Sequence, residues 1–249
     1  MSASGLYKNR ELVDEAVKQV SAVIQPGDVI NQCCAKHKWW EIWKTIPAMA
    51  ICWHQKKLFG KKSNWKDTHT MLYFDLTNTF SVELPKATLK PLQEFCLSNM
   101  SIYRLKLKSL TTDDISIMWK TAHSLLGEKY DVGQLLDIAI NDLLGFDNQR
   151  PLIIFDAGRK NKVCSVGVRA IFESLYQRAI RTANSKQGKW LFYEMNPEKW
   201  PAKKVREYRG TDVEATSPAH FANSDCFCFD FELIARFNEG KRIDLVNTT

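Results

Sequence analysis

The chain has 249 residues, of which 45% are hydrophobic and 11% aromatic, and this composition excludes a disordered or fibrous protein. No apolar run is long enough to span a bilayer and the charged first residues do not resemble a secretory signal, so we expect a cytoplasmic protein without a transmembrane segment. The net charge of +7 arises in residues 1–110, which hold 16 Lys and Arg against 9 Asp and Glu.

The first half of the chain predicts one helix followed by strands. Apolar residues at helical spacing indicate an N-terminal helix within residues 1–25. After an extended segment that begins at Val29, alternating apolar and polar residues indicate three strands. They are "HTMLYFD" (69–75), "TFSVEL" (79–84) and "SIYRLKLKSL" (101–110), which we expect to form an antiparallel meander.

The second half predicts mainly helices. A cluster of Thr and Asp N-cap residues precedes a helix that Gly127 ends. The predicted elements are helices at 113–126, 132–144 and 165–182, a polar excursion at 183–218, and a late strand at 225–237.

These elements predict an α+β fold in which an antiparallel sheet packs against helices. We expect a single domain over residues 26–235, preceded by the helix in residues 1–25 and followed by a C-terminal tail at 236–249. Residues 36–66 and 183–218 are read as insertions in that domain.

The seven cysteines are an odd number without a disulfide ladder, which favours reduced thiols. Cys33, Cys34 and His37, and likewise Cys226 and Cys228, lack the usual two-residue spacing of metal ligands. No glycine-rich nucleotide motif is present either. We therefore expect no metal and no cofactor.

Cys164 lies where a loop turns into a helix. The free N–H groups of a helix N-terminus and its partial positive charge favour a thiolate, and the nearby Arg159, Lys160 and Lys162 act in the same direction. The position alone leaves two interpretations open, a reactive thiol and a small buried residue at the start of a helix.

A cysteine nucleophile needs a base and a group that orients the base. His69 begins a strand, Glu83 lies on the next one, and both are about equally far from the turn near 77–79, so we expect them to be cross-strand neighbours. Glu83 could instead be an exposed charge at the sheet edge. The other histidines fit solvated, surface or turn positions: His37, His54, His123 and His220.

Six short motifs follow one another in a recognisable order. They are "GDVI" (27–30), "THTMLYFD" (68–75), "TFSVELPKATLKPL" (79–92), "LLGEKYD" (125–131), "KVCSVGV" (162–168) and "TSPAHFANSDCF" (216–227). In this order the chain resembles the circularly permuted papain-like cysteine hydrolases of the NlpC/P60 superfamily, in the branch with YiiX-like and lecithin–retinol acyltransferase-like proteins. The resemblance implies a permuted papain-like fold with Cys164 as nucleophile at a helix N-terminus, His69 as base and Glu83 as third polar residue.

The resemblance implies a thiol peptidase or amidase that cleaves an amide through a thioester. Its substrate would be a cell-wall (peptidoglycan) peptide or an acyl-amide. A phage protein would fit this class of substrate. The chain departs from the family pattern at Thr68, Val163 and Val166. One alternative is a non-catalytic binding or structural module associated with a virion or a cell wall, and another is a lipid acyltransferase. If the protein is viral, we expect it in the virion.

Residues 36–66 form a basic, tryptophan-rich segment with eight Lys, one acidic residue and five of the eight Trp. Aromatic faces between lysines suit a polyanion, a sugar or a membrane interface. We expect this segment to dock substrate or a cell-wall surface through Trp39, Trp40 and Trp65, although the tryptophans could equally pack on the core. Without a helix-turn-helix, zinc finger or RNP motif, we do not expect sequence-specific nucleic-acid binding.

Overall fold

The computed structural model describes residues 3–33, 48–49, 51–53, 55–56, 66–106, 109–131, 133, 163–181, 217–222 and 231–243. Several predictions fall outside these residues. They are almost all of the helix at 132–144, residues 183–216 of the polar excursion, the start of the late strand, Arg159, Lys160 and Lys162, Cys34, Cys226 and Cys228, His37 and His54, and Trp39, Trp40 and Trp65.

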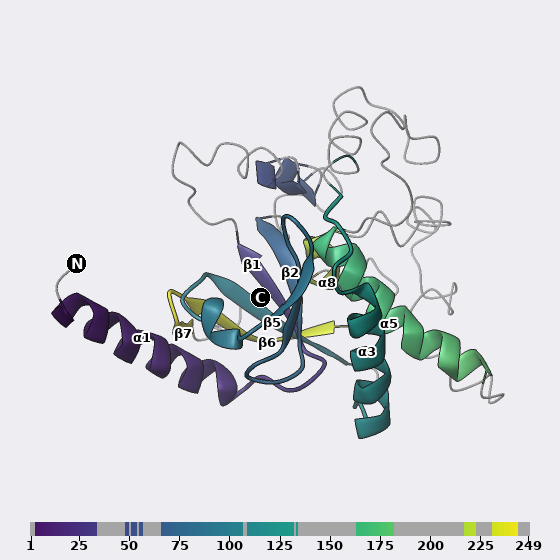
Figure 1. Cartoon of the computed structure of the whole chain (residues 1–249), viewed down its shortest axis with the longest axis horizontal. Helices are drawn as coiled ribbons and strands as arrows, with labels where there is room; N and C mark the ends of the chain where they lie inside the picture. Colours follow the sequence, from purple (N-terminus) through teal and green to yellow (C-terminus); the bar gives the residue numbers. More distant parts are fainter. Residues whose placement is uncertain are drawn as a thin grey trace, which may run out of the picture.

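The described part of the chain contains helices and a seven-stranded sheet (Figure 1). In chain order the elements are α1 (Ala3–Ser21), β1 (Val29–Cys33), β2 (Asp67–Tyr73), β3 (Thr79–Val82), β4 (Ala87–Lys90), the 3-10 turn η2 (Leu92–Glu94), β5 (Met100–Leu105), α3 (Thr112–Leu125), α5 (Cys164–Arg181), α8 (Pro218–Ala222), β6 (Phe231–Asn238) and β7 (Lys241–Ile243). Antiparallel sheet and helices together confirm the α+β class.

The order of the strands differs from the predicted meander. It runs β4-β3-β2-β1-β5-β6-β7, and all neighbouring strands are antiparallel. The three strands β2, β3 and β4 do form a meander, but β5 pairs with β1 rather than with them. Strand β1 lies at the centre of the sheet, and it is apolar on both faces. Val29 and Ile30 point to opposite faces and are both fully buried.

The sheet also reaches further toward the C-terminus than the sequence suggests. Strand β6 continues to Asn238, and β7 pairs with it, so residues 236–243 belong to the sheet rather than to a tail. Strand β4 was not predicted, because its alternation of apolar and polar residues extends over only four positions.

Successive residues of the central strands alternate between two hydrophobic clusters, one on each face. Val29, Leu72 and Tyr103 pack with α3 and α5, whereas the neighbouring Ile30 and Ile102 pack with α1 and η2. Figure 1 shows α1 on one side of the sheet and α3 with α5 on the other. The sheet is thus covered on both faces, and none of the helices in the described residues is long and apolar enough to cross a membrane.

The predicted ends of α3 are confirmed. Thr111 and Asp114 form a capping box, in which the Thr111 side chain accepts from the Asp114 N–H and the Asp114 carboxylate accepts from the Thr111 N–H. Just past the C-cap, Gly127 has a φ of +84°, a left-handed conformation that glycine adopts without steric cost. This turn leads directly to Tyr130 and Asp131, which lie near the candidate site.

Candidate active site

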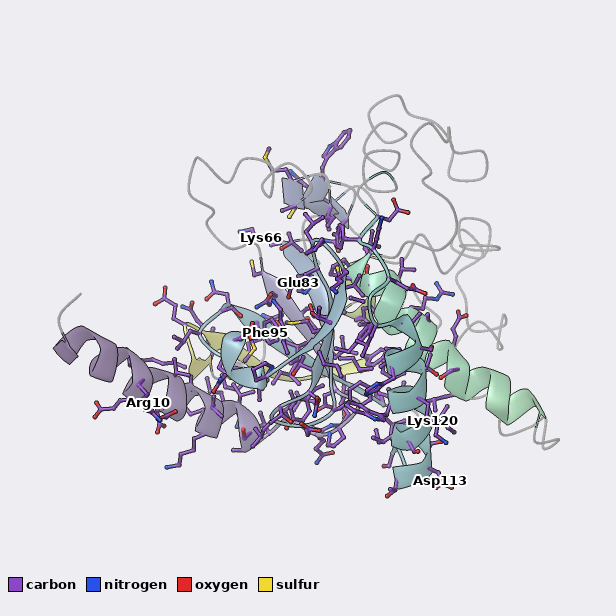
Figure 2. The ribbon with its side chains drawn as sticks, viewed as in Figure 1. Arg10, Lys66, Glu83, Phe95, Asp113 and Lys120 are labelled. Atoms are coloured by element: carbon purple, nitrogen blue, oxygen red, sulfur yellow. The ribbon has the colours of Figure 1, made fainter. Side chains whose placement is uncertain are left out.

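The site forms where strands β2 and β3 separate. Their register pairs Tyr73 with Thr79 and Met71 with Ser81, and β3 ends at Val82. Continued by two residues, the same register brings His69 opposite Glu83, as the equal distances from the turn predicted. Figure 2 shows Glu83 at the end of the sheet where α5 begins.

Helix α5 brings Cys164 to this end of the sheet. Its first turn packs so closely on β3 that a Cβ placed on Gly167 would lie 2.7 Å from Cγ2 of Val82. A side chain larger than hydrogen would therefore push the start of the helix away from the strand. Glycine at this position allows Cys164, three residues earlier, to approach the strand that carries His69.

Cys164 is the first residue of α5, and its side chain is only 1% exposed. The backbone N–H groups of Ser165 and Thr70 donate hydrogen bonds to its sulfur, and the His69 ring is hydrogen-bonded to it as well. The Ser165 N–H is one of those in the first helical turn that have no acceptor within the helix. Burial alone would raise the pKa of Cys164, but the charge of His69 and these hydrogen bonds lower it below the ordinary thiol value.

His69 faces negative groups on two sides. Its Nε2 lies 2.8 Å from the Ser81 Oγ and 3.5 Å from Oε1 of Glu83, and the ring is also hydrogen-bonded to Cys164. Burial favours the neutral ring, but the negative charge on the sulfur, followed by that on Glu83, outweighs burial and raises the pKa of His69 from 6.5 to about 9. The pair therefore favours an imidazolium beside a thiolate.

Glu83 is not an isolated charge at the sheet edge. Its Oε1 accepts a hydrogen bond of 2.8 Å from Ser81, and its Oε2 accepts one of 2.7 Å from Lys90. Burial would raise the pKa of Glu83, but His69, Lys90 and Ser81 together lower it well below the usual range for a carboxyl group. Glu83 is consequently ionised at neutral pH.

Three residues at the site were not predicted. Ser81 precedes Glu83 by two positions on the same strand, so the period of two could have placed both on one face. Lys90 belongs to β4, which the sequence did not reveal. Tyr130 packs against Val163 and Val166, and burial followed by the negative charges nearby raises its pKa well above the ordinary tyrosine value.

The remaining predicted residues lie away from this cluster or outside the described part of the chain. His123 is exposed on α3, where its ring stacks edge-on against Trp119. The backbone of His220 belongs to α8, and its side chain lies outside the described part of the structure. In the described part of the 36–66 segment, Trp53 is exposed, whereas Ile51 is buried. Within the described ranges, no group of three or more His, Cys, Asp or Glu side chains could hold a metal ion.

Comparisons with known proteins add little to this geometry. No family model matches the chain, and no curated protein matches it. A solved structure, the metalloprotein YiiX from Escherichia coli O157:H7, is similar to it with 14% sequence identity and a TM-score of 0.42, over 86% of this chain and 98% of that one.

Proposed function

We propose that the chain is a cysteine-dependent amide hydrolase, a peptidase or amidase of permuted papain-like fold. The observation that carries the proposal is the hydrogen-bonded pair of Cys164 and His69, in which the pKa of the thiol is lowered and that of the imidazole is raised. A thiolate is the nucleophilic form of cysteine, and an imidazolium beside it can deliver a proton to a leaving group.

The proposed reaction has two halves. In the first, the Cys164 thiolate attacks the carbonyl carbon of the amide, the C–N bond breaks, and His69 gives its proton to the departing nitrogen, which leaves a thioester and a neutral imidazole. In the second, His69 takes a proton from water, the resulting hydroxide attacks the thioester, and the thiolate leaves. The Cys164 N–H at the helix start is the proposed donor to the oxyanion.

A competition between cysteines tests the reactivity of the thiol. Cys33 and Cys52 are half-buried and hence more accessible than Cys164, whereas Cys96 is as buried and, among the described residues, bonds to the Leu92 carbonyl rather than to a basic group. If thiolate character decides the rate, substoichiometric iodoacetamide at pH 7 modifies Cys164 first. If accessibility decides, Cys33 and Cys52 react first and the assignment of the nucleophile is wrong. Peptide mass spectrometry of the labelled protein measures the order.

Trapping of the acyl-enzyme tests the chemistry itself. Incubation with p-nitrophenyl acetate should acetylate Cys164 rapidly and release further p-nitrophenol in a slower steady phase as water resolves the thioester. Cys164→Ser should abolish both phases, and Cys96→Ser should leave both unchanged. Equal acetylation of several cysteines without steady turnover would contradict the hydrolase assignment.

One observation favours a second candidate, a non-catalytic binding module on the same scaffold. The Cys164 side chain is 1% exposed, and a substrate carbonyl must reach its sulfur. If neither iodoacetamide nor p-nitrophenyl acetate modifies Cys164 in the folded protein, while peptidoglycan fragments bind equally to the native chain and to Cys164→Ala, the binding module is the correct function.

A further inference from the structure

Ser81 occupies the position between His69 and Glu83. It lies on β3, is 0% exposed, and has an Oγ that is 2.8 Å from Nε2 of His69 and 2.8 Å from Oε1 of Glu83. The direct distance from Nε2 to Oε1 is 3.5 Å, whereas N–H···O hydrogen bonds span about 2.7–3.2 Å. At Nε2 the serine oxygen is thus closer than the carboxylate oxygen.

The direction of these hydrogen bonds follows from the charge of Glu83. An ionised carboxylate has no proton to donate, so the Ser81 hydroxyl donates to it and offers only a lone pair to His69. Nε2 of His69 must then carry a hydrogen in the neutral ring as well as in the charged ring. This leaves Nδ1 as the nitrogen that exchanges a proton with Cys164.

Lys90 fixes the second oxygen of the Glu83 carboxylate. It donates to Oε2 of Glu83 at 2.7 Å and lies 3.6 Å from Glu94, so Glu83 is fixed on the side opposite its contact with Ser81. With one oxygen held by Lys90 and the other by Ser81, the Glu83 carboxylate is fixed in an orientation that leaves Oε1 3.5 Å from Nε2 of His69.

We propose that Ser81 is a positioning residue for His69, and that its hydroxyl connects Glu83 to the imidazole by two short hydrogen bonds, beside the direct ion pair of 3.5 Å. The site is then a chain of four groups, Cys164, His69, Ser81 and Glu83, with Lys90 at its end. This role in catalysis rests on the proposed function, but the arrangement of the imidazole can be measured without any turnover.

The test is a titration of His69 by NMR in protein with ¹⁵N-labelled histidine, with the His69 signals assigned from His69→Gln. Ser81→Ala should lower the pKa of His69 by about one unit, a tenfold change in its proton affinity, and should let the Nδ1–H tautomer appear in the neutral ring. Glu83→Gln should lower the pKa as well. The double variant should resemble Glu83→Gln alone, because both substitutions interrupt the same path.

A matched pair of variants separates the hydroxyl from the packing. Ser81→Thr keeps the hydroxyl and Ser81→Val replaces it with a methyl group of the same shape, so Thr should retain the native titration and Val should lose it. Thermal unfolding of each variant shows whether it is folded. Should Ser81→Ala and Ser81→Val leave the pKa and the tautomer of His69 unchanged, Glu83 acts directly and the proposal is overturned.

The two proposals fail separately. If the titration of His69 depends on Ser81 but the protein does not turn over p-nitrophenyl acetate, the positioning role is supported and the hydrolase function is contradicted. Turnover by a protein whose His69 does not respond to Ser81 would do the reverse.

Discussion

Two fully buried cysteines lie in the hydrophobic clusters on opposite faces of the sheet. Cys96 is 0% exposed and donates its only hydrogen bond in the described residues to the Leu92 carbonyl, at 3.3 Å. Cys164 is 1% exposed and has an imidazole and two backbone N–H groups around its sulfur. Burial raises the pKa of Cys96 to about 12, whereas the pKa of Cys164 is lowered despite the same burial.

The comparison of Cys96 with Cys164 separates the effect of burial on a thiol from the effect of hydrogen-bond donors around it. The position of a cysteine in the sequence does not separate them. A buried sulfur loses the water that would stabilise its charge, so its thiol form is favoured unless the protein supplies donors in place of water. An acceptor such as the Leu92 carbonyl stabilises only the thiol. Donors such as His69, Thr70 and Ser165 stabilise the thiolate more than the thiol, whose sulfur is a weak acceptor. The neighbours of a buried cysteine therefore determine its reactivity.

Removal of His69 should have the largest effect on the reactivity of Cys164, because it makes the surroundings of this sulfur similar to those of Cys96. In His69→Gln, burial acts without the positive ring, so the thiolate fraction at pH 7 and the rate of iodoacetamide labelling should fall by at least about 100-fold. His123→Gln, the same change at an exposed histidine of α3, is the matched control. Labelling of Cys164 at an undiminished rate in His69→Gln would show that the imidazole does not activate the thiol.

A buried carboxylate two residues from His69 extends the comparison to acidic groups. Asp67 is buried and accepts a hydrogen bond of 3.2 Å from the Asn31 side chain, and burial raises its pKa from 3.8 to about 6 in spite of that bond and the charge of Arg236. Because the folded state holds this proton more tightly than the unfolded state, the stabilisation is complete below pH 3.8 and is lost as the pH rises through 6.

Asp67→Asn should remove this pH dependence, since Asn keeps an acceptor for Asn31 and carries no charge. Its free energy of unfolding, relative to the native chain, should increase by about 2–3 kcal/mol between pH 4 and pH 7. Urea unfolding at several pH values measures the difference. Asp75→Asn provides a control of opposite sign, because hydrogen bonds from Thr77 and Asn78 lower the pKa of Asp75. A difference for Asp67→Asn that is constant with pH would contradict the assignment.

Local patterns predicted the parts of the fold that depend on neighbours in the chain. The turn near 77–79 sets the register of β2 and β3, and with it the approach of His69 to Glu83. The capping box and Gly127 set the ends of α3. The central place of β1 was not predictable in the same way, because its pairing with β5 joins segments about 70 residues apart and leaves no periodic signal.

The candidate site likewise contains features that local patterns predict and features that depend on contacts between distant segments. The sequence placed Cys164 at a helix start and His69 on a strand, but it gave no way to rank Ser81 above Glu83 as the partner of the imidazole. That ranking depends on a difference between 2.8 Å and 3.5 Å. It also depends on Lys90, which reaches Glu83 only because β4 folds back on β3.

A smaller effect is expected on the other side of the sheet. Cys96→Ala removes a buried sulfur from the cluster that packs under α1 and should reduce the free energy of unfolding by about 1 kcal/mol. The rate at which iodoacetamide labels Cys164 should not change, because the two sulfurs belong to different clusters. Chemical denaturation and peptide mass spectrometry provide both measurements, and slower labelling of Cys164 in this variant would show that the two faces are coupled.

The smallest effect is expected from Lys90→Met. Lys90 is partly exposed, and ion pairs in contact with water contribute about 0–1 kcal/mol. Glu83 should remain ionised at pH 7 without it, because His69 and Ser81 also lower its pKa. The labelling rate of Cys164 at pH 7 should therefore change by less than about threefold. Lys86→Met, at an exposed lysine four residues earlier, is the control. A loss as large as that of His69→Gln would mean that the charge of Glu83, and through it the thiolate, depends on Lys90.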